Sequence, residues 1–242
     1  MLNRLKELET AVAHKSRPLN GERPYFHQSG SLPILISAPH ATAHRRRNRL
    51  KREEGFTGGM AHLLAETTGA HALYCCYQSP DDPNWDPRSP YKTELKNIVN
   101  ENEIQFVLDL HGMSNRHKIG LALGSMNGRS CPRQEPTILE TLSSKFIQTN
   151  ESTAKSFLRL RWDHFVLNHS RFTGGVTNQT ITRFVSQQLG IPALQVELCA
   201  AVRVVANPTS RLPFPPYRGQ PEPILQTVAA LQAVIQKIAI AL

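Results

Sequence analysis

The sequence has few cysteines, and their spacing offers neither a disulfide framework nor a cysteine-rich metal site. The four cysteines are Cys75, Cys76, Cys131 and Cys199, and none of them forms a C-x-x-C pair. Secreted disulfide-rich domains and cysteine-rich zinc sites both use recurring, closely spaced pairs. The simplest expectation is therefore a reducing, cytoplasmic location.

The sequence also lacks the long hydrophobic runs of a signal peptide or a membrane span. Residues 1–9 are charged and helix-like, without the apolar core of a signal peptide. The most apolar segment, residues 224–242, is interrupted by the polar side chains Gln226, Gln232, Gln236 and Lys237. This segment is expected to be a helix packed on the core, with no membrane contact.

Acidic residues are scarce relative to basic ones, with 19 Asp and Glu against 28 Lys and Arg, so the formal net charge is +9. Much of the excess lies in the run HRRRNRLKR at residues 44–52. Such a run can be a solvated loop, attract an anionic substrate or bind nucleic acid. Because it has no interleaved aromatic residues for base stacking, nucleic acid is the least favoured of the three.

No internal repeat of solenoid or propeller length is visible, and 242 residues fit one large α/β domain or two small ones. Apolar runs predict strands at 34–38, 70–77, 106–110 and 193–198, with helical patterns between them. A strand at 119–123 is expected beside the strand at 106–110. The alternation predicts a three-layer α/β/α fold with a mostly parallel or mixed central sheet.

We expect one domain over residues 1–242. Residues 1–30 would form an N-terminal helix and a lead-in segment. Residues 207–242 would form a Pro-rich loop and the C-terminal helix, since repeated prolines exclude regular structure in the first part of this segment. No oligomeric state is predicted.

Side chains that could bind a metal lie where three of the predicted strands stop. They are His40, His111 and Glu197, and a further carboxylate, Glu54, begins a helical pattern after His40. In open α/β sheets the ligand site lies beyond the carboxyl ends of the strands. These side chains are therefore expected to lie close together.

Two histidines and two glutamates match the needs of a hydrolase with one zinc ion. Catalytic zinc takes three protein ligands and keeps one position for water, whose pKa falls to about 7. We expect His40, Glu54 and His111 as the ligands and Glu197 as the general acid and base. Asp109 lies two residues before His111, on the same side of the strand, and could orient its imidazole.

Each of these residues also has a simpler explanation. His40 could be an ordinary loop histidine, Asp109 a buried polar group, and Glu54 a solvated residue near a helix N-terminus. Glu197 is the hardest to explain in this way. A carboxylate within the apolar run 193–198 is costly to bury without a charged or metal partner.

The motifs that carry these residues resemble those of the N-formylglutamate amidohydrolase family, distant relatives of the zinc carboxypeptidases. They are Pro39-His40, Glu54-Gly55-Phe56-Thr57, Asp82-Pro83-Asn84-Trp85-Asp86, Leu108-Asp109-Leu110-His111-Gly112-Met113, Arg171-Phe172-Thr173-Gly174-Gly175 and Leu194-Gln195-Val196-Glu197-Leu198. They follow the family's order over residues 33–203. The resemblance implies a phosphorylase/hydrolase-like fold, Zn2+ as cofactor, and the ligand and acid/base roles given above.

The resemblance also implies arginine and asparagine side chains that hold the substrate's carboxylate and scissile carbonyl. The candidates are Arg171 and Asn84, followed by Arg88, Arg116 and Arg203. A guanidinium binds carboxylates bidentately and stabilises an oxyanion, although each arginine could instead be ordinary surface charge. The expected substrate is a small anionic amino-acid derivative carrying an N-formyl or N-acyl group.

Two other functions remain open. The same centre could serve a carboxypeptidase-like metallopeptidase or a deacylase acting on other small amides. Alternatively, a non-catalytic protein could use the basic run 44–52 to bind an anionic polymer or nucleic acid. In that case Glu197 would have no role in function.

Overall fold

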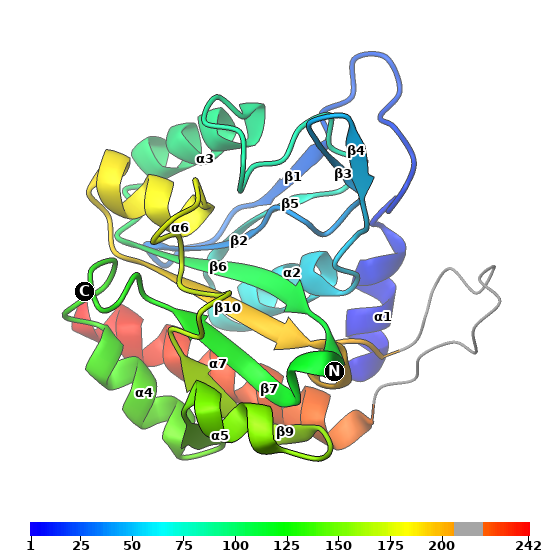
Figure 1. Cartoon of the computed structure of the whole chain (residues 1–242). Helices are drawn as coiled ribbons and strands as arrows, with labels where there is room; N and C mark the ends of the chain where they lie inside the picture. Colours follow the sequence, from blue (N-terminus) through cyan, green and yellow to red (C-terminus); the bar gives the residue numbers. More distant parts are fainter. Residues whose placement is uncertain (206–219) are drawn as a thin grey trace, which may run out of the picture.

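The computed structural model describes residues 1–205 and 220–242, so the predicted Pro-rich loop lies outside the described residues up to residue 219. Its centre is an eight-stranded sheet with the order β1-β5-β2-β6-β10-β7-β9-β8 (Figure 1). The strands are β1 (Tyr25–Gln28), β2 (Ile34–Ala38), β5 (His71–Cys75), β6 (Phe106–Met113), β7 (Ile119–Gly124), β8 (Ile147–Thr149), β9 (Arg161–Leu167) and β10 (Ala193–Cys199).

The sheet is mixed, as the alternation of strands and helices predicted. β5, β2, β6 and β10 run parallel to one another, whereas β1 is antiparallel to β5 and β7 is antiparallel to β10. The prediction that the strand at 119–123 lies beside the strand at 106–110 is wrong. β10 is inserted between them, because a strand from late in the chain provides a parallel partner for β6 on the side that β2 leaves open.

Helices cover both faces of the sheet. On one face, a large apolar core joins α1 (Leu2–Thr10), α2 (Thr57–Thr68), α4 (Glu135–Ser143) and α7 (Pro221–Ala241) to the strands. On the other face, a smaller core includes α3 (Pro90–Glu101), α6 (Ile181–Phe184) and the π-helical turn η2 (Val185–Leu189). The remaining helical segments are η1 (Asn115–His117), α5 (Glu151–Ser156) and η3 (Ala200–Val202). Together they form the expected three layers.

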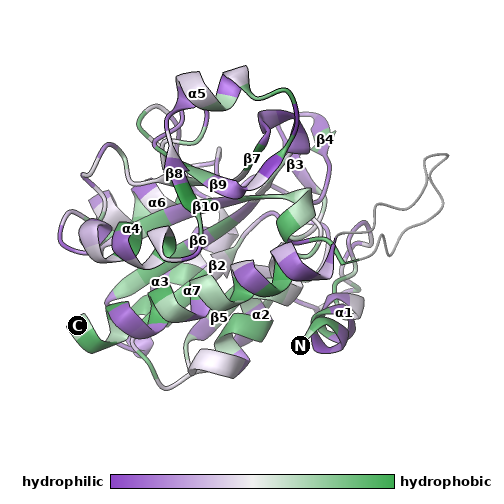
Figure 2. Cartoon of the chain, turned by 90° about the horizontal axis from the view of Figure 1, so that it is seen from below, coloured by the Kyte–Doolittle hydropathy of each residue, from purple (hydrophilic) through white to green (hydrophobic). Residues whose placement is uncertain are grey.

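The C-terminal helix α7 is apolar because it packs on the core. By length and composition it could cross a membrane, and 44% of the apolar stretch concerned is buried in the fold. Figure 2 shows α7 next to α2 and α4, and it is in contact with both. This arrangement is the packed helix that the sequence predicted.

The basic run 44–52 forms a hairpin of two short antiparallel strands, β3 (His44–Arg46) and β4 (Arg49–Lys51), rather than the expected loop. The β3 strand is held to the body of the protein, since His44 bridges to Ser79. All three residues of β4 are exposed. The hairpin therefore presents its charges to solvent at a fixed place beside β2 and β5.

Alternation along β6 decides which side chains face the site. Leu108 and Leu110 belong to the large core, whereas Val107 belongs to the smaller core on the opposite face. Because side chains alternate along a strand, Asp109 and His111 lie on the same face as Val107. Beyond the smaller core this face is lined by polar side chains, and the candidate site is found there.

Candidate metal centre

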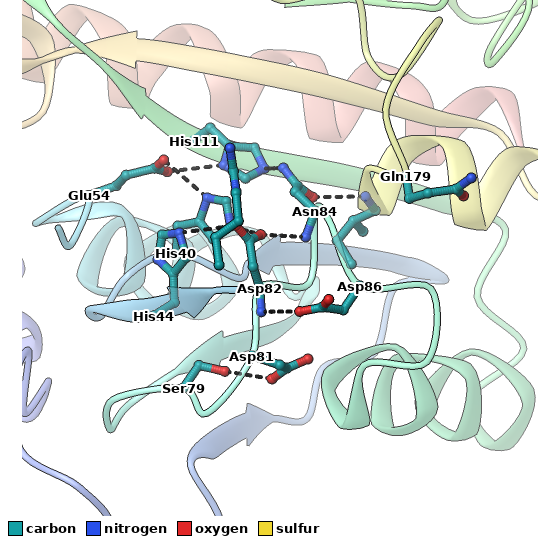
Figure 3. A network of polar contacts seen from close by, with 12 residues as sticks. His40, His44, Glu54, Ser79, Asp81, Asp82, Asn84, Asp86, His111 and Gln179 are labelled. Atoms are coloured by element: carbon teal, nitrogen blue, oxygen red, sulfur yellow. Dashed lines mark hydrogen bonds and ion pairs between the residues drawn. The ribbon is translucent and has the colours of Figure 1, made fainter. Parts of the chain in front are cut away.

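Two imidazoles converge on one carboxylate at the end of the parallel strands. His40 Nδ1 lies 3.1 Å from Glu54 Oε1, and His111 Nδ1 lies 3.0 Å from Glu54 Oε2. Figure 3 shows the Glu54 carboxylate facing both rings, with a dashed line to each. One potential ligand atom from each residue lies within 4.8 Å of the others. The structure thus brings the three predicted ligands together.

Hydrogen bonds to its backbone and to its carboxylate hold Glu54 in place. The Glu54 N–H donates to the carbonyl of His40 at 2.8 Å, and the hydroxyl of Thr57 donates to the carbonyl of Glu54 at 2.8 Å. Oε2 also accepts the N–H of Gly112 at 2.9 Å. The start of α2 is thereby attached both to the turn after β2 and to the end of β6.

The other ring nitrogen of each histidine faces a buried aspartate. His40 Nε2 lies 3.0 Å from Asp82 Oδ1, and His111 Nε2 lies 3.3 Å from Asp109 Oδ2. Metal-binding histidines usually have such a carboxylate on the nitrogen that does not bind the metal. The contact of Asp109 is the predicted one. Asp82 was not singled out, although it begins one of the family-like motifs.

The charges of the site favour a cation. Burial alone would lower the pKa of His40, but Glu54 and Asp82 outweigh it and raise that pKa to about 9. Burial would likewise lower the pKa of His111, yet Asp109 and Glu54 raise it well above its usual value. Burial opposes ionisation of Glu54, but the two histidines hold the pKa of Glu54 well below its usual range. A bound cation could satisfy the same negative charges in place of the ring protons.

These residues fit zinc. Catalytic zinc sites combine His and Glu ligands in this number and leave one coordination position open. The contact of Asp109 Oδ2 with His111 Nε2, at 3.3 Å, agrees with this, because an aspartate there can hold the His111 imidazole in one orientation.

A second possible metal group shares His40 and adds His44 and Asp82. The His44 ring is stacked on that of His40, with centroids 3.9 Å apart. The Asp82 oxygens are already engaged by Arg46 and by the N–H of Asn84. Because neither His44 nor Asp82 lines the cavity, the set with Glu54 is better placed for substrate.

Glu197 faces the same cavity from β10. It is the direct neighbour of His111 in the parallel pairing of β10 with β6. Glu197 is 7% exposed, and burial raises its pKa to about 7. Its Oε1 accepts a hydrogen bond of 3.0 Å from Gln195 Nε2. The residue predicted as general base therefore lies beside a predicted ligand.

Gln195 connects Glu197 to the loop that follows β9. Its Oε1 accepts the N–H of Gly174 at 2.9 Å, while its Nε2 donates to Glu197. Gly174 has a φ of +77°, a conformation that glycine adopts without strain. This chain of hydrogen bonds holds the Arg171–Gly175 motif over the site, a role for Gln195 that the sequence did not indicate.

The cavity at the centre has a volume of about 240 Å³. Besides the ligand set and Glu197, its walls include Asn84, Arg171, Arg46 and Trp85. The Asn84 amide already has partners, with Nδ2 3.0 Å from His111 Nε2 and Oδ1 accepting the N–H of Ile181 at 3.0 Å. Arg171 is exposed at the cavity rim, where its guanidinium is available to a substrate.

The other three predicted substrate residues do not line this cavity. Arg88 is exposed elsewhere, and Arg116 lines a neighbouring hollow. Arg203 is buried and donates to the carbonyls of Leu198 and Gly55. Its guanidinium packs so closely on Gly112 that a Cβ there would lie 2.6 Å from Nη2. Arg203 therefore joins β10 to the segment that carries Glu54, a structural contact that its sequence position did not reveal.

No model of a protein family matches this chain, and no curated protein does. Solved structures that are similar to it include a bacteriophage poly-gamma-glutamate hydrolase, with 14% identity, a TM-score of 0.48, and coverage of 91% of this chain and 92% of that one. N-formylglutamate amidohydrolase from Ralstonia eutropha JMP134 has 14% identity and a TM-score of 0.47, covering 89% of this chain and 97% of that one. For a metallo-carboxypeptidase from Pseudomonas aeruginosa the identity is 14% and the TM-score 0.46, covering 99% and 67%.

An N-formylglutamate amidohydrolase and metallo-carboxypeptidases are thus among the structures that this chain is similar to, as its motifs predicted. The similarity is remote in both sequence and superposition. The function therefore has to be inferred from the site itself.

Proposed function

We propose that this protein is a zinc-dependent amide hydrolase, similar in reaction to N-formylglutamate amidohydrolase, which cleaves an N-formyl or N-acyl amino acid. The observation that carries the proposal is the shared Glu54 carboxylate. It lies between His40 Nδ1 and His111 Nδ1, at 3.1 and 3.0 Å, in a cavity that Glu197 also lines. A cytoplasmic location remains a prediction from the four free cysteines.

His40, Glu54 and His111 would hold the zinc ion. Once bound, zinc would lower the pKa of a water molecule and polarise the substrate carbonyl. Glu197 would take a proton from the attacking water and later give it to the departing nitrogen. The C–N bond breaks, the carbonyl carbon gains the water oxygen, and the products are a carboxylic acid and an amine. A pKa of about 7 for Glu197 suits a group that must both accept and donate a proton near neutral pH.

Arginines at the cavity rim suit an acidic substrate. Arg171 and Arg46 both line the cavity, and each guanidinium can bind a carboxylate through two hydrogen bonds. Arg46 already pairs with Asp82, which leaves Arg171 as the main candidate. We therefore expect a carboxylate on the amino-acid part of the substrate, bound at the Arg171 side.

The direct test combines metal analysis with a substrate panel. Purified protein should contain one zinc ion per chain, and the variants His40→Ala and His111→Ala should have lost it. His62→Ala, in α2 and outside the cavity, is the matched control and should retain the metal. Absence of zinc from the wild type and all variants after zinc loading would refute the metal centre.

The substrate panel separates the remaining alternatives. N-formyl amino acids, N-acyl amino acids and short peptides would be tested on the zinc-loaded protein. Turnover of peptides alone would make the protein a metallopeptidase, and turnover of other N-acyl amino acids would make it a deacylase. No turnover, together with salt-sensitive binding to nucleic acid, would favour a binding protein.

A further inference from the structure

The central cavity is flanked by two basic hollows, and it shares lining residues with each of them. One hollow, of about 530 Å³, lies along the β3–β4 hairpin and shares Arg46 and Trp85 with the central cavity. The other, of about 400 Å³, shares Arg171 with it. The three spaces thus follow one another, with the candidate metal centre in the middle one.

The two hollows lie over different halves of the sheet. The hairpin follows β2, whereas the second hollow is formed by η1, α5 and the segment after β9. In the strand order, β6 and β10 separate β2 from β7 and β9 (Figure 1). A ligand that occupied all three spaces would therefore cross the strands above the candidate centre.

The charged side chains that line the hairpin hollow are basic, and most of them form no ion pair within the described residues. Its charged lining residues are Arg46, Arg47, Arg49 and Lys51. Of these, only Arg46 takes part in an ion pair among the described residues, with Asp82. The guanidinium carbons of Arg46 and Arg47 lie 5.4 and 5.1 Å from the centre of the Trp85 ring. Trp85 thus holds two guanidinium groups beside the cavity.

The second hollow is basic as well. Its charged lining residues include Arg116, Lys118, Lys155 and Arg171, against one acidic residue, Glu151. Lys155 pairs with Glu151 at 2.6 Å, while Arg116 and Arg171 form no ion pair within the part of the chain that the structure describes. Two arginines are therefore free to bind an anionic ligand on this side.

We propose that the protein binds an acidic peptide chain across the sheet, with carboxylates in both basic hollows and one amide bond over the His40–Glu54–His111 set. The N-acyl amino acid proposed above would then be part of a chain of acidic residues joined by amide bonds. Cleavage rests on the function proposed above, whereas binding of the chain does not.

The length of the track sets the length of the ligand. The distance from β2 to the region of β7 and β9 is three to four strand spacings, or about 14–19 Å. An extended peptide covers about 3.3–3.6 Å per residue, so about four to six residues would fill the track. A dipeptide could reach only one of the two hollows.

A peptide suits the track better than nucleic acid. Single-stranded nucleic acid is bound by several aromatic platforms that stack on bases. Trp85 is the aromatic side chain of the hairpin hollow, and its ring is near two guanidinium groups. Free arginines instead suit carboxylates, which they bind through two parallel hydrogen bonds.

The test measures binding without cleavage. Fluorescein-labelled di-glutamate and hexa-glutamate would be titrated into zinc-loaded Glu197→Gln protein, with fluorescence anisotropy as the readout. The hexamer should bind at least about 10-fold more tightly, a difference of about 1.4 kcal/mol. Equal affinity for the two lengths would overturn the proposal, and so would tighter binding of a single-stranded oligonucleotide of equal charge.

Charge reversal locates the track. The double variant Arg49→Glu with Lys51→Glu, on the exposed strand β4, should bind hexa-glutamate about 10-fold more weakly than the parent protein does. The difference in affinity between hexa-glutamate and di-glutamate should become smaller. Lys96→Glu with Lys237→Glu changes the net charge equally, on the exposed surfaces of α3 and α7, and should leave the affinity unchanged. Equal losses in both pairs would mean that only net charge matters, and would overturn the proposal.

The outcome is separable from that of the amide-hydrolase proposal. Length-dependent binding without turnover of any amide would leave the track intact and refute the hydrolase. Turnover of N-formylglutamate, together with equal affinities for di-glutamate and hexa-glutamate, would support the hydrolase and refute the track.

Discussion

Asp82 Oδ1 lies 3.0 Å from His40 Nε2, on the opposite side of the imidazole from Glu54. The aspartate is buried, and its own N–H donates to Asp86 Oδ2 at 2.8 Å. Burial opposes its ionisation, but His40 and His44 hold the pKa of Asp82 well below its usual range. Asp82 is thus a fixed negative charge that keeps Nδ1 of His40 directed at the candidate metal position.

Asp82→Asn should weaken zinc binding by about 10–100-fold, because the amide is a poorer acceptor for the ring N–H and lowers the basicity of the imidazole. Zinc affinity would be measured by competition with a chelator. Asp81→Asn changes the neighbouring carboxylate, which bonds to Ser79 and not to His40, and serves as the control. Similar affinities in all three proteins would show that Asp82 does not support the site.

Glu197→Gln should reduce turnover by at least about 100-fold while folding and zinc content remain those of the wild type. The substitution keeps the shape of the side chain but removes its capacity to accept a proton from water. Circular dichroism and metal analysis would accompany the rate measurement. A variant with near-normal turnover would exclude Glu197 as the general base.

Gln195→Leu should lower kcat more than it raises KM, since Gln195 holds Glu197 and does not carry charge in the reaction. The loss of one hydrogen bond to a charged group, about 1.5–3 kcal/mol, corresponds to a decrease of roughly 10- to 150-fold. Gln195→Glu places two carboxylates side by side and should shift the acid limb of the pH–rate profile upward. An unchanged profile in both variants would refute the positioning role.

Glu9 should make the free energy of unfolding depend on pH. Its carboxylate accepts the N–H of Gly59 at 3.0 Å at the start of α2, yet burial raises its pKa to about 7. Because the folded-state pKa lies above the ordinary value of 4.5, the associated stability is present below about pH 4.5 and is lost as the pH rises through about 7. The upper bound of this loss is about 3 kcal/mol.

The measurement compares wild type with Glu9→Gln, which cannot ionise. Urea unfolding between about pH 5 and about pH 8 should show the wild type losing stability relative to the variant. Other titrating groups are common to both proteins and cancel in the difference. Curves that stay parallel would mean that the backbone N–H groups of Phe56 and Gly59, which both donate to Glu9, keep it ionised throughout.

The central strands could be predicted from the sequence, because each is marked by its own run of apolar residues. The apolar runs of β2, β6 and β10 are buried over nearly their whole length, so they stand out in the sequence. Since parallel strands end at the same edge, placing His40 and His111 at strand ends was enough to predict that they meet. Glu54 was added to them because a catalytic zinc needs a third ligand and because the family resemblance gives it that role.

Long-range pairing could not be predicted in this way. The insertion of β10 between β6 and β7 depends on which strand edges are free, which no local pattern records. The contact of Asp82 with His40 spans 42 positions and depends on the path of a Pro-rich loop. Arg203 was expected to bind substrate, because its neighbours in the sequence give no indication that it reaches Gly55.

The pairing of His111 with Glu197 across β6 and β10 has a consequence for how this protein can change over evolution. Their separation is set by the backbone hydrogen bonds between two central strands. Neighbouring strands of a sheet lie about 4.8 Å apart, and this spacing does not depend on the surrounding loops. The β3–β4 hairpin and the segment around Arg171, in contrast, belong to connections outside these two strands. New substrate preferences could therefore arise by exchanging those segments while the spacing between His111 and Glu197 is inherited unchanged.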